Sequence, residues 1–450
     1  MKRLGVLLLV LCALLGLAVP ASASVRRYEG EIGGAAYRVM VPADWNGTLV
    51  LWSHGAYGAP PSRIALTDQP ATEDYLLAQG FALAGSQFRT PVGWSVEDGL
   101  RDQVALLDWF RRTVGPPRRT ISAGESVGGA TATVLAERNP RRFDGVLTLC
   151  GAVGGGASYW NSGLDVMFAV KTLLGADFEL VKIADPKANG TRAAAAIAAA
   201  GNDPAGRARI ALASALGDIP GWFDPTAPRP AGLAEQLDWM RVWTQYLRTW
   251  AVDVGRADLE RWAGGNPSWN TGIDYRRVLD RSSEKSLVRQ AYAAAGLDLG
   301  ADLARLAGAP RIAADPSAVA YLARTSLPIG RNPWPVVAVH NVADGLLPIS
   351  NQTAYGDRVH RKSDLRQFPV DRAGHCRFTA SEEITAFTTL FDRLDDGVWP
   401  ATDPATLNTA ASAFGPDKQL VTNPLTGADA LVRPTFSGYR PGPYPRSLPF

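Results

Sequence analysis

Histidine, cysteine and clustered positive charge are all scarce in this chain of 450 residues. It contains four histidines and three cysteines, and its formal net charge is +3. No run of lysine or arginine forms the basic patch with which a protein contacts nucleic acid, so we expect no nucleic-acid partner. Any reaction that needs a histidine base has only four candidates.

One long apolar run, residues 4–19, lies at the amino terminus. It follows a lysine and an arginine and precedes the small-residue pattern Pro20-Ala21-Ser22-Ala23, an order typical of a secretory signal peptide. A membrane anchor is the weaker interpretation, because the run is short for a bilayer and contains two glycines. The sequence therefore predicts a signal peptide over residues 1–24. We expect a secreted protein, extracellular or periplasmic, with no stable membrane insertion after cleavage.

The pentapeptide Gly124-Glu125-Ser126-Val127-Gly128 matches the nucleophile elbow of a serine hydrolase. The elbow requires a strand before the serine and a helix after it, because only a sharp turn between the two exposes the hydroxyl at a sheet edge. Residues 118–123 are a short β-prone run, and residues 127–138 are rich in small and apolar side chains and end at Asn139-Pro140. This context predicts that Ser126 is a nucleophile rather than a residue of a surface turn.

Strand and helix patterns alternate on both sides of this elbow. The run at 48–53 is apolar on both faces, as a strand of a helix-covered parallel sheet must be. The alternation predicts a doubly wound, mostly parallel α/β sheet with ligands beyond the carboxyl ends of its strands. The predicted strands are 25–32, 35–42, 48–53, 81–84, 118–123, 143–149, 335–340 and 365–369.

The alternation stops after the sixth strand, where the pattern becomes helical without a convincing strand. We interpret this stretch as a helical lid, and we expect its aromatic stripe (Trp239, Trp243, Tyr246 and Trp250) to pack the lid rather than contact substrate. The predicted organisation is a signal peptide (1–24), a first core segment (25–156), the lid (157–330), a second core segment (331–398) and an extended tail (399–450).

A serine nucleophile needs a histidine base, which a third group must orient. In this architecture the order along the chain is serine, acid, histidine, so the base comes late in the sequence. His375 fits best, because it lies in a loop between the last predicted strand and a helix that begins at Thr379. Of the other histidines, His360 is expected on the surface, His340 in a structural role and His54 in the oxyanion loop.

The acid should follow the strand at 335–340, so that its carboxylate reaches the imidazole across the sheet edge. Asp344 meets this condition, and Asp371 is the rival because it is nearer to His375 in sequence. Two amides must bind the oxyanion of the tetrahedral intermediate. We expect those of Val127 and Ala56, with Tyr57 as second choice for the latter.

Together these residues resemble the α/β-hydrolase superfamily over residues 30–150 and 335–395. The resemblance rests on His54-Gly55, the elbow, Asp344 and Ala373-Gly374-His375-Cys376. It implies an α/β-hydrolase fold with a Ser-His-Asp triad, and it leaves the lid and the tail outside the resemblance.

The segment His375-Cys376 is also similar to that of secreted tannases and feruloyl esterases, where the cysteine after the histidine pairs with a cysteine before the nucleophile. Here Glu125 stands in that second position, while Cys150 ends the strand after the elbow helix. Two interpretations stay open: a Cys150–Cys376 disulfide that fixes the histidine loop, or two buried free thiols.

The sequence thus predicts a secreted serine hydrolase that cleaves small-molecule or polymer-derived carboxylic esters through an acyl-enzyme. No metal or organic cofactor is implied. The first alternative is a serine peptidase of the same fold, in which acidic residues of the lid bind an amine; the candidates are Asp165, Glu179, Glu235 and Asp238. A non-catalytic binding protein on this scaffold is less favoured, because that interpretation needs a lost triad member and none is lost.

Overall fold

The computed structural model describes residues 24–446, so the predicted signal peptide falls outside the described residues except for its last position. An eight-stranded sheet forms the centre of the molecule, in the order β1-β2-β4-β3-β5-β6-β7-β8. Its strands are β1 (Val25–Ile32), β2 (Ala35–Pro42), β3 (Thr48–Ser53), β4 (Ala82–Ser86), β5 (Arg119–Glu125), β6 (Gly145–Leu149), β7 (Val336–Ala343) and β8 (Leu365–Ala373).

The sheet is parallel from β4 to β8, and only β1 and β2 run antiparallel to their neighbours. Both of its faces are covered. Along β3, Leu49 and Leu51 belong to one hydrophobic cluster while Val50 and Trp52 belong to another, and all four are fully buried. This arrangement is the α/β-hydrolase fold and confirms the fold class predicted from the sequence.

Five helices accompany the sheet of the core. The helix α3 connects β5 to β6 and carries the serine of the elbow at its first residue. The helix α14 follows Thr379, as predicted, and starts with a capping box: the Thr379 side chain accepts from the Glu382 amide while the Glu382 carboxylate accepts from the Thr379 amide. The helices of the core are α1 (Pro70–Ala78), α2 (Val96–Thr113), α3 (Ser126–Arg138), α13 (Ser350–Arg358) and α14 (Ala380–Asp396).

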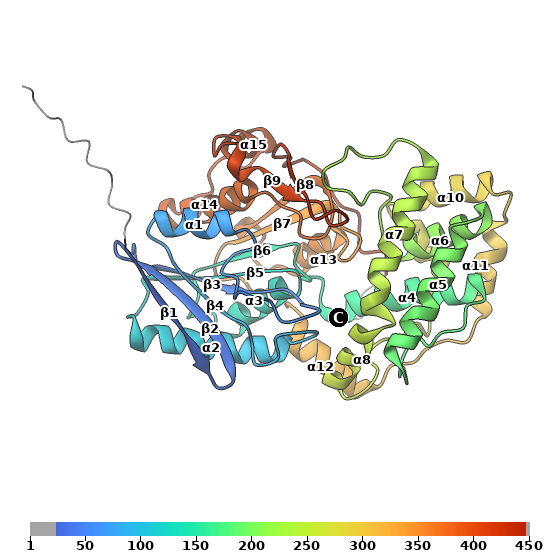
Figure 1. Ribbon diagram of the computed structural model, residues 1–450, viewed down its shortest axis with the longest axis horizontal. Helices are drawn as coiled ribbons and strands as arrows, with labels where there is room; N and C mark the ends of the chain where they lie inside the picture. Colours follow the sequence, from blue (N-terminus) through green and yellow to red (C-terminus); the bar gives the residue numbers. More distant parts are fainter. Residues whose placement is uncertain (1–23, 447–450) are drawn as a thin grey trace, which may run out of the picture.

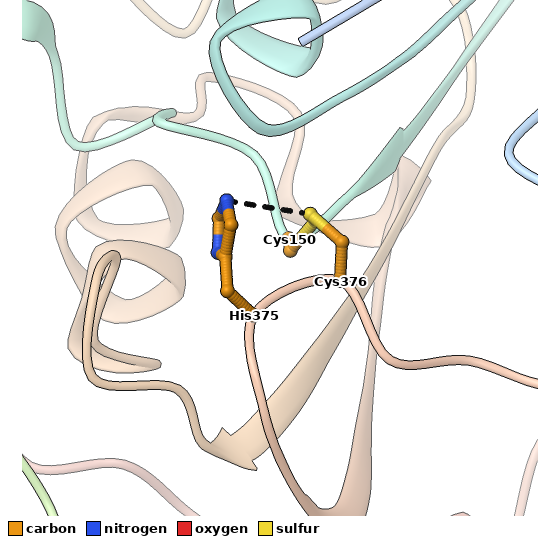
Figure 2. Close-up of side chains that lie close together, drawn as sticks. All are labelled: Cys150, His375 and Cys376. Carbon is orange, nitrogen blue, oxygen red and sulfur yellow. Dashed lines mark hydrogen bonds between the residues drawn. A yellow bond between two sulfur atoms is a disulfide. The ribbon is translucent and has the colours of Figure 1, made fainter. Parts of the chain in front are cut away.

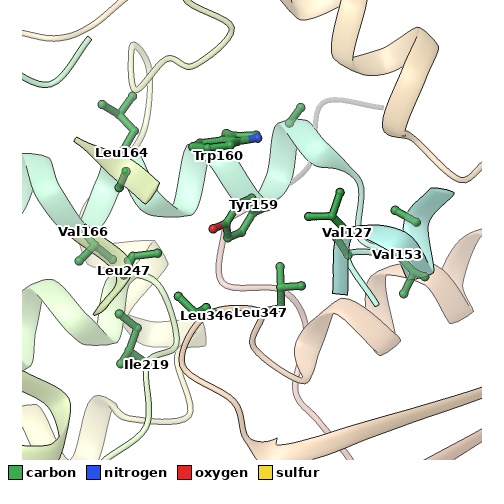
Figure 3. Close-up of a cluster of buried hydrophobic side chains, with 14 of the residues drawn as sticks. Val127, Val153, Tyr159, Trp160, Leu164, Val166, Ile219, Leu247, Leu346 and Leu347 are labelled. Atoms are coloured by element: carbon green, nitrogen blue, oxygen red, sulfur yellow. The ribbon is translucent and has the colours of Figure 1, made fainter. Parts of the chain in front are cut away.

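Between β6 and β7 the described chain forms helices and no strand (Figure 1, green to orange). This insertion shares one hydrophobic cluster with the core: Val127 of α3 and Trp160 and Leu247 of the insertion belong to it (Figure 3). The two parts are therefore packed against each other. The helices of the insertion are α4 (Gly156–Leu174), α5 (Pro186–Ala200), α6 (Pro204–Leu216), α7 (Leu233–Ala251), α8 (Val254–Ala263), α9 (Tyr275–Arg281), α10 (Lys285–Ala294), α11 (Leu299–Gly308) and α12 (Pro316–Ser326).

The carboxyl-terminal segment differs from the extended tail expected from its composition. It contains the helix α15 (Pro404–Ser412) and a short antiparallel pair, β9 (Leu420–Thr422) and β10 (Asp429–Leu431). The start of α15 follows a common rule, because Asp403 caps the Thr406 amide at 3.0 Å and proline occupies the first helical position. Single turns of 3-10 helix lie at Lys362–Asp364 and Pro416–Lys418.

Beyond β10 the chain returns to the sheet and then crosses to the insertion. Phe436 forms an antiparallel bridge with Val370 of β8. Further on, the Arg446 guanidinium pairs with the buried Asp165 carboxylate of α4 at 2.9 Å. The tail therefore contacts both parts of the molecule. Among the described helices, none combines the length and the apolar character that crossing a membrane requires.

Candidate active site

Ser126 lies at the turn from β5 into α3 and has a φ of 53°, which is unusual for a residue with a side chain. Two glycines make this turn possible. A Cβ on Gly128 would lie 2.1 Å from the Ser53 carbonyl oxygen and 2.3 Å from that of His54. A Cβ on Gly124 would lie 2.4 Å from the Gly128 carbonyl oxygen. The backbone of the elbow thus packs directly on the end of β3, with no room for larger residues.

The structure brings Ser126, His375 and Asp344 into one hydrogen-bonded chain, although they come from three separate loops at the carboxyl ends of β5, β8 and β7. Nε2 of His375 lies 2.9 Å from the Ser126 hydroxyl oxygen, and Nδ1 lies 2.7 Å from Oδ2 of Asp344. The other Asp344 oxygen accepts from the amides of Leu346 and Leu347 at 2.9 and 3.0 Å. This is the geometry in which a serine is deprotonated by an oriented imidazole.

Asp344 is buried, yet its surroundings favour the charged form. Burial by itself would raise the pKa of this carboxyl, but the charge and the hydrogen bonds of His375 and His340 outweigh burial and lower the pKa to about 2. Nε2 of His340 lies 3.5 Å from Oδ2 of Asp344. Sequence reasoning assigned His340 a structural role and did not detect its contact with Asp344.

The rival for the acid, Asp371, and another candidate for the base, His360, lie away from Ser126. Asp371 belongs to β8 and its exposed carboxylate pairs with Arg229 at 2.8 Å, away from the imidazole. His360 is exposed, as expected, and lies just after the end of α13. Neither residue contacts the Ser126 hydroxyl.

His54 follows β3 and is buried against aromatic rings. It stacks on Tyr57 and Phe88 with ring centroids 4.6 and 4.1 Å apart, and its Nδ1 lies 2.6 Å from the Gly55 carbonyl oxygen. Burial lowers the pKa of His54, so the ring is held in its neutral form. Its role is to shape the loop that carries Ala56.

A small cavity of about 60 Å³ lies at the nucleophile, and both residues favoured for the oxyanion hole line it. These are Ala56 and Val127; Tyr57, the second choice, lines a different cavity. The Ala56 amide donates no hydrogen bond to any other residue of the described chain. Val127 is the second residue of α3, where amides have no acceptor within the helix. We call this space the inner cavity.

The helix α7 covers the inner cavity, and here the structure differs from the expectation for the aromatic stripe. Tyr246 and Trp250 line the inner cavity beside Ser126, so these two rings face the nucleophile. Trp243 is buried and packs on Gly345, where a Cβ would lie 2.3 Å from its ring. Part of the stripe therefore packs in the interior, and part of it lines the inner cavity. Periodicity gave the common face of the helix, but the surface that this face contacts depends on tertiary packing.

A disulfide joins Cys150, just after β6, to Cys376. Figure 2 shows the bond beside the imidazole of His375, whose Nε2 lies 3.5 Å from the sulfur of Cys376. In the described chain, these two cysteines and His375 are the group with spacing suited to a metal ion. Because the sulfurs are bonded to each other, they offer no thiolate ligand. The bond instead connects the histidine loop to the sheet.

The carboxyl groups of Asp68, Glu125 and Glu383 gather next to the elbow, a cluster that sequence reasoning missed. Burial, followed by the charge of Asp68, raises the pKa values of both Glu125 and Glu383. The Glu383 carboxylate accepts from the Thr72 hydroxyl at 2.7 Å. Neighbouring carboxyls cannot all ionise, so the cluster keeps a proton at a pH where an isolated carboxyl has lost it. No local sequence signal links three segments so far apart.

Comparison with known proteins gives one extensive sequence match. A scan of protein-family models finds no match. The o-phthalyl amidase of Xanthobacter agilis is 31% identical over 425 residues, which is 86% of this chain and 92% of that protein.

Solved structures resemble the chain more distantly. Feruloyl esterase B of Aspergillus oryzae is 11% identical, with a TM-score of 0.41 over 84% of this chain and 82% of its own. The acylaminoacyl peptidase of Pyrococcus horikoshii is also 11% identical, with a TM-score of 0.40 over 86% of this chain and 44% of its own. On the strength of the sequence match, the chain is a hydrolase and belongs to the same family as the o-phthalyl amidase of Xanthobacter agilis.

Proposed function

We propose that the protein is a serine hydrolase that cleaves amides of aromatic carboxylic acids through an acyl-enzyme. The observation that carries this proposal is the hydrogen-bonded chain from the Ser126 hydroxyl through His375 to Asp344, at 2.9 and 2.7 Å. Acyl transfer needs a nucleophile, a base that returns the proton, and donors for the oxyanion. Each has a candidate at the inner cavity.

In the proposed reaction the Ser126 oxygen attacks the carbonyl carbon while Nε2 of His375 takes its proton. The oxyanion of the tetrahedral intermediate lies between the Ala56 and Val127 amides. When the intermediate collapses, the carbon–nitrogen bond breaks and His375 passes the proton to the leaving amine. Water then attacks the acyl-enzyme while His375 takes its proton. His375 returns that proton to the Ser126 oxygen as the acid leaves. Asp344 holds the imidazole in one tautomer and stabilises its charged form.

The choice of an amide bond comes from the relative, which is named as an o-phthalyl amidase. A phthalyl amide is a benzoic amide with a carboxylate at the ortho position. Esters, which the sequence alone favoured, are the second candidate. The triad geometry supports them equally, since an ester has a better leaving group and passes through the same intermediate.

The peptidase alternative receives little support. It needs an acidic side chain at the reactive centre to bind an amine, and none of the four lid acids named from the sequence lines the inner cavity. Asp165, one of the four, is buried and already paired with Arg446. An acidic residue in that position stabilises the contact between tail and insertion.

We also propose that the insertion acts as a lid and that the chain is exported. Tyr246 and Trp250 of α7 cover the inner cavity, which supports a lid that controls access. The amino-terminal pattern and the Cys150–Cys376 disulfide support export, because disulfides persist in oxidising compartments. Mass spectrometry of the protein recovered outside the cytoplasm tests this: a first residue near Val25 is the expected result.

A hydrolysis panel tests the reaction. The substrates are the anilides of phthalic and benzoic acids, the phenyl ester of benzoic acid and an aminoacyl anilide, each given to the wild type and to Ser126→Ala. Turnover of the aromatic amides, lost in the variant, is expected. Turnover of the ester alone transfers the assignment to the esterase candidate, and turnover of the aminoacyl anilide alone to the peptidase. If the wild type cleaves nothing, the proposed function is wrong.

A further inference from the structure

A second cavity, of about 430 Å³, opens on the side of His375. We call it the histidine-side cavity. It is bounded by four parts of the chain: the loop between α6 and α7, α7 itself, the loop after β8 and the turn between β9 and β10. Its walls are mainly apolar, with Phe223, Trp243 and Leu425 among them. Tyr246 and His375 line both this cavity and the inner cavity, so the two cavities adjoin at the imidazole.

Arg377 provides a positive charge in this cavity. Its backbone is fixed, because its amide donates to Oδ1 of Asn341 at 2.9 Å and its carbonyl accepts from the Asn341 side chain at 3.0 Å. Its guanidinium, in contrast, forms no ion pair or hydrogen bond with any residue between 24 and 446. No aspartate or glutamate of the described chain lines the cavity.

The charge of Arg377 affects the phenol of Tyr246. Burial raises the pKa of the Tyr246 phenol, and the neighbouring Arg377 guanidinium opposes that rise. Arg377 is half-buried, and its guanidinium has no partner among the described residues. An arginine in this state presents a planar set of donors that matches a carboxylate.

We propose that Arg377 binds a carboxylate of the substrate, which makes the histidine-side cavity a carboxylate subsite next to the reactive serine. This inference rests on the proposed function and names the substrate class more closely: an aromatic acyl amide that carries a carboxylate. The apolar walls accommodate the ring, and the guanidinium selects the charge. Arg377 is thus a specificity-determining residue and takes no part in proton transfer.

The carboxylate has two chemical sources. It can belong to the acyl group, ortho to the scissile bond as in a phthalyl amide, or to the leaving amine, which His375 protonates on this side of the site. Three substrates distinguish these sources: the anilide of phthalic acid, the benzoyl amide of 4-aminobenzoate and the anilide of benzoic acid. The first carries the carboxylate on the acyl group, the second on the amine and the third has none.

Kinetics with these substrates form the first test, using the wild type, Arg377→Gln and Arg377→Lys. Arg289→Gln is the matched control, because Arg289 is an exposed arginine of α10 that does not line the cavity. Arg377→Gln should lower kcat/KM about 10- to 100-fold, chiefly through KM, for whichever substrate carries the carboxylate in the correct place. Benzanilide should change less than about twofold, and Arg377→Lys should retain part of the preference. An equal loss for all three substrates overturns the proposal.

Binding forms the second test and does not depend on turnover. Phthalate and benzoate are titrated into Ser126→Ala and into Ser126→Ala/Arg377→Gln by calorimetry. A preference for phthalate that disappears with Arg377→Gln supports the subsite, even if the wild type hydrolyses none of the amides and the proposed function fails. 4-Aminobenzoate is titrated in the same way as the amine-side probe. Equal affinity in the two variants for both phthalate and 4-aminobenzoate overturns the subsite, whatever the amides show.

Discussion

Nε2 of His340 lies 3.5 Å from Oδ2 of Asp344, the same oxygen that accepts the hydrogen bond from His375. Asp344 therefore faces two imidazoles. His340 is itself held in place, because its Nε2 also lies 2.7 Å from the Leu347 carbonyl oxygen. A carboxylate buried in this way is stabilised in its charged form, which is the form that orients a catalytic imidazole.

The lowered pKa of Asp344 predicts a loss of stability in acid. Its pKa falls from 3.8 to about 2 on folding, so its contribution is present above the unfolded value and is lost as the pH falls through about 2. The free energy of unfolding should therefore decrease by roughly 2 kcal/mol more in the wild type than in Asp344→Asn over this window. Urea titrations at pH 5 and at pH 2.5 measure the difference; identical losses in the two proteins contradict the prediction.

Replacing either candidate acid distinguishes their roles. Asp344→Asn should lower kcat by about 10³- to 10⁴-fold with little change in KM, because the amide holds His375 in the wrong tautomer. Asp371→Asn is the matched control, since the exposed Asp371 carboxylate pairs with Arg229 and forms no hydrogen bond with His375 in the described chain. Its kcat should stay within twofold of the wild type. Steady-state kinetics check both, and a comparable loss in the control would show that the acid is wrongly assigned.

The close approach at the elbow predicts that Gly128→Ala does not form the native site. The added Cβ would lie 2.1 Å from the Ser53 carbonyl oxygen, and backbone on both sides prevents its relief. Activity should be lost together with a decrease in the yield of folded protein. Gly308→Ala, in α11 with nothing within 4 Å of the new Cβ, should be neutral or more stable by about 0.5–1 kcal/mol. Thermal unfolding of the two variants, with circular dichroism, provides the comparison.

The disulfide beside His375 predicts a redox dependence of both stability and turnover. Cys376→Ser removes the connection between the histidine loop and the end of β6, and should lower the free energy of unfolding by about 2–4 kcal/mol. Because His375 is the adjacent residue, kcat should fall as well. Urea unfolding and kinetics, with and without reductant, test the prediction: reductant should affect the wild type and leave Cys376→Ser unchanged. Two free thiols in the denatured, unreduced wild type would contradict the bond itself.

The fold, and the three side chains that meet at the elbow, could be predicted from the sequence because their signals are local or depend on chain order. Gly124 and Gly128 define a turn that needs contact with the end of a neighbouring strand, and the predicted strands supply it. Asp344 was preferred to Asp371 because the loop after β7 reaches the sheet edge, and the structure brings Asp344 to the imidazole.

What the sequence could not provide are features formed by packing between distant segments. Arg377 appeared as an ordinary loop residue, because the cavity that it lines requires α7 and the tail to come together around it. The cluster of Glu125 with Asp68 and Glu383 has the same origin. The helix α15 is a different case, because Asp403-Pro404 is a local start signal that the interpretation of the tail by its composition did not use.

The hydroxyl of Ser126 and the imidazole of His375 are separated by 249 positions along the chain. A ribosome that has completed the elbow must still synthesise the whole insertion before any base is available to activate the serine. Under the proposed function, Ser126 has no base until His375 has been synthesised. A product that stops before β8 should therefore carry the serine and show no hydrolysis.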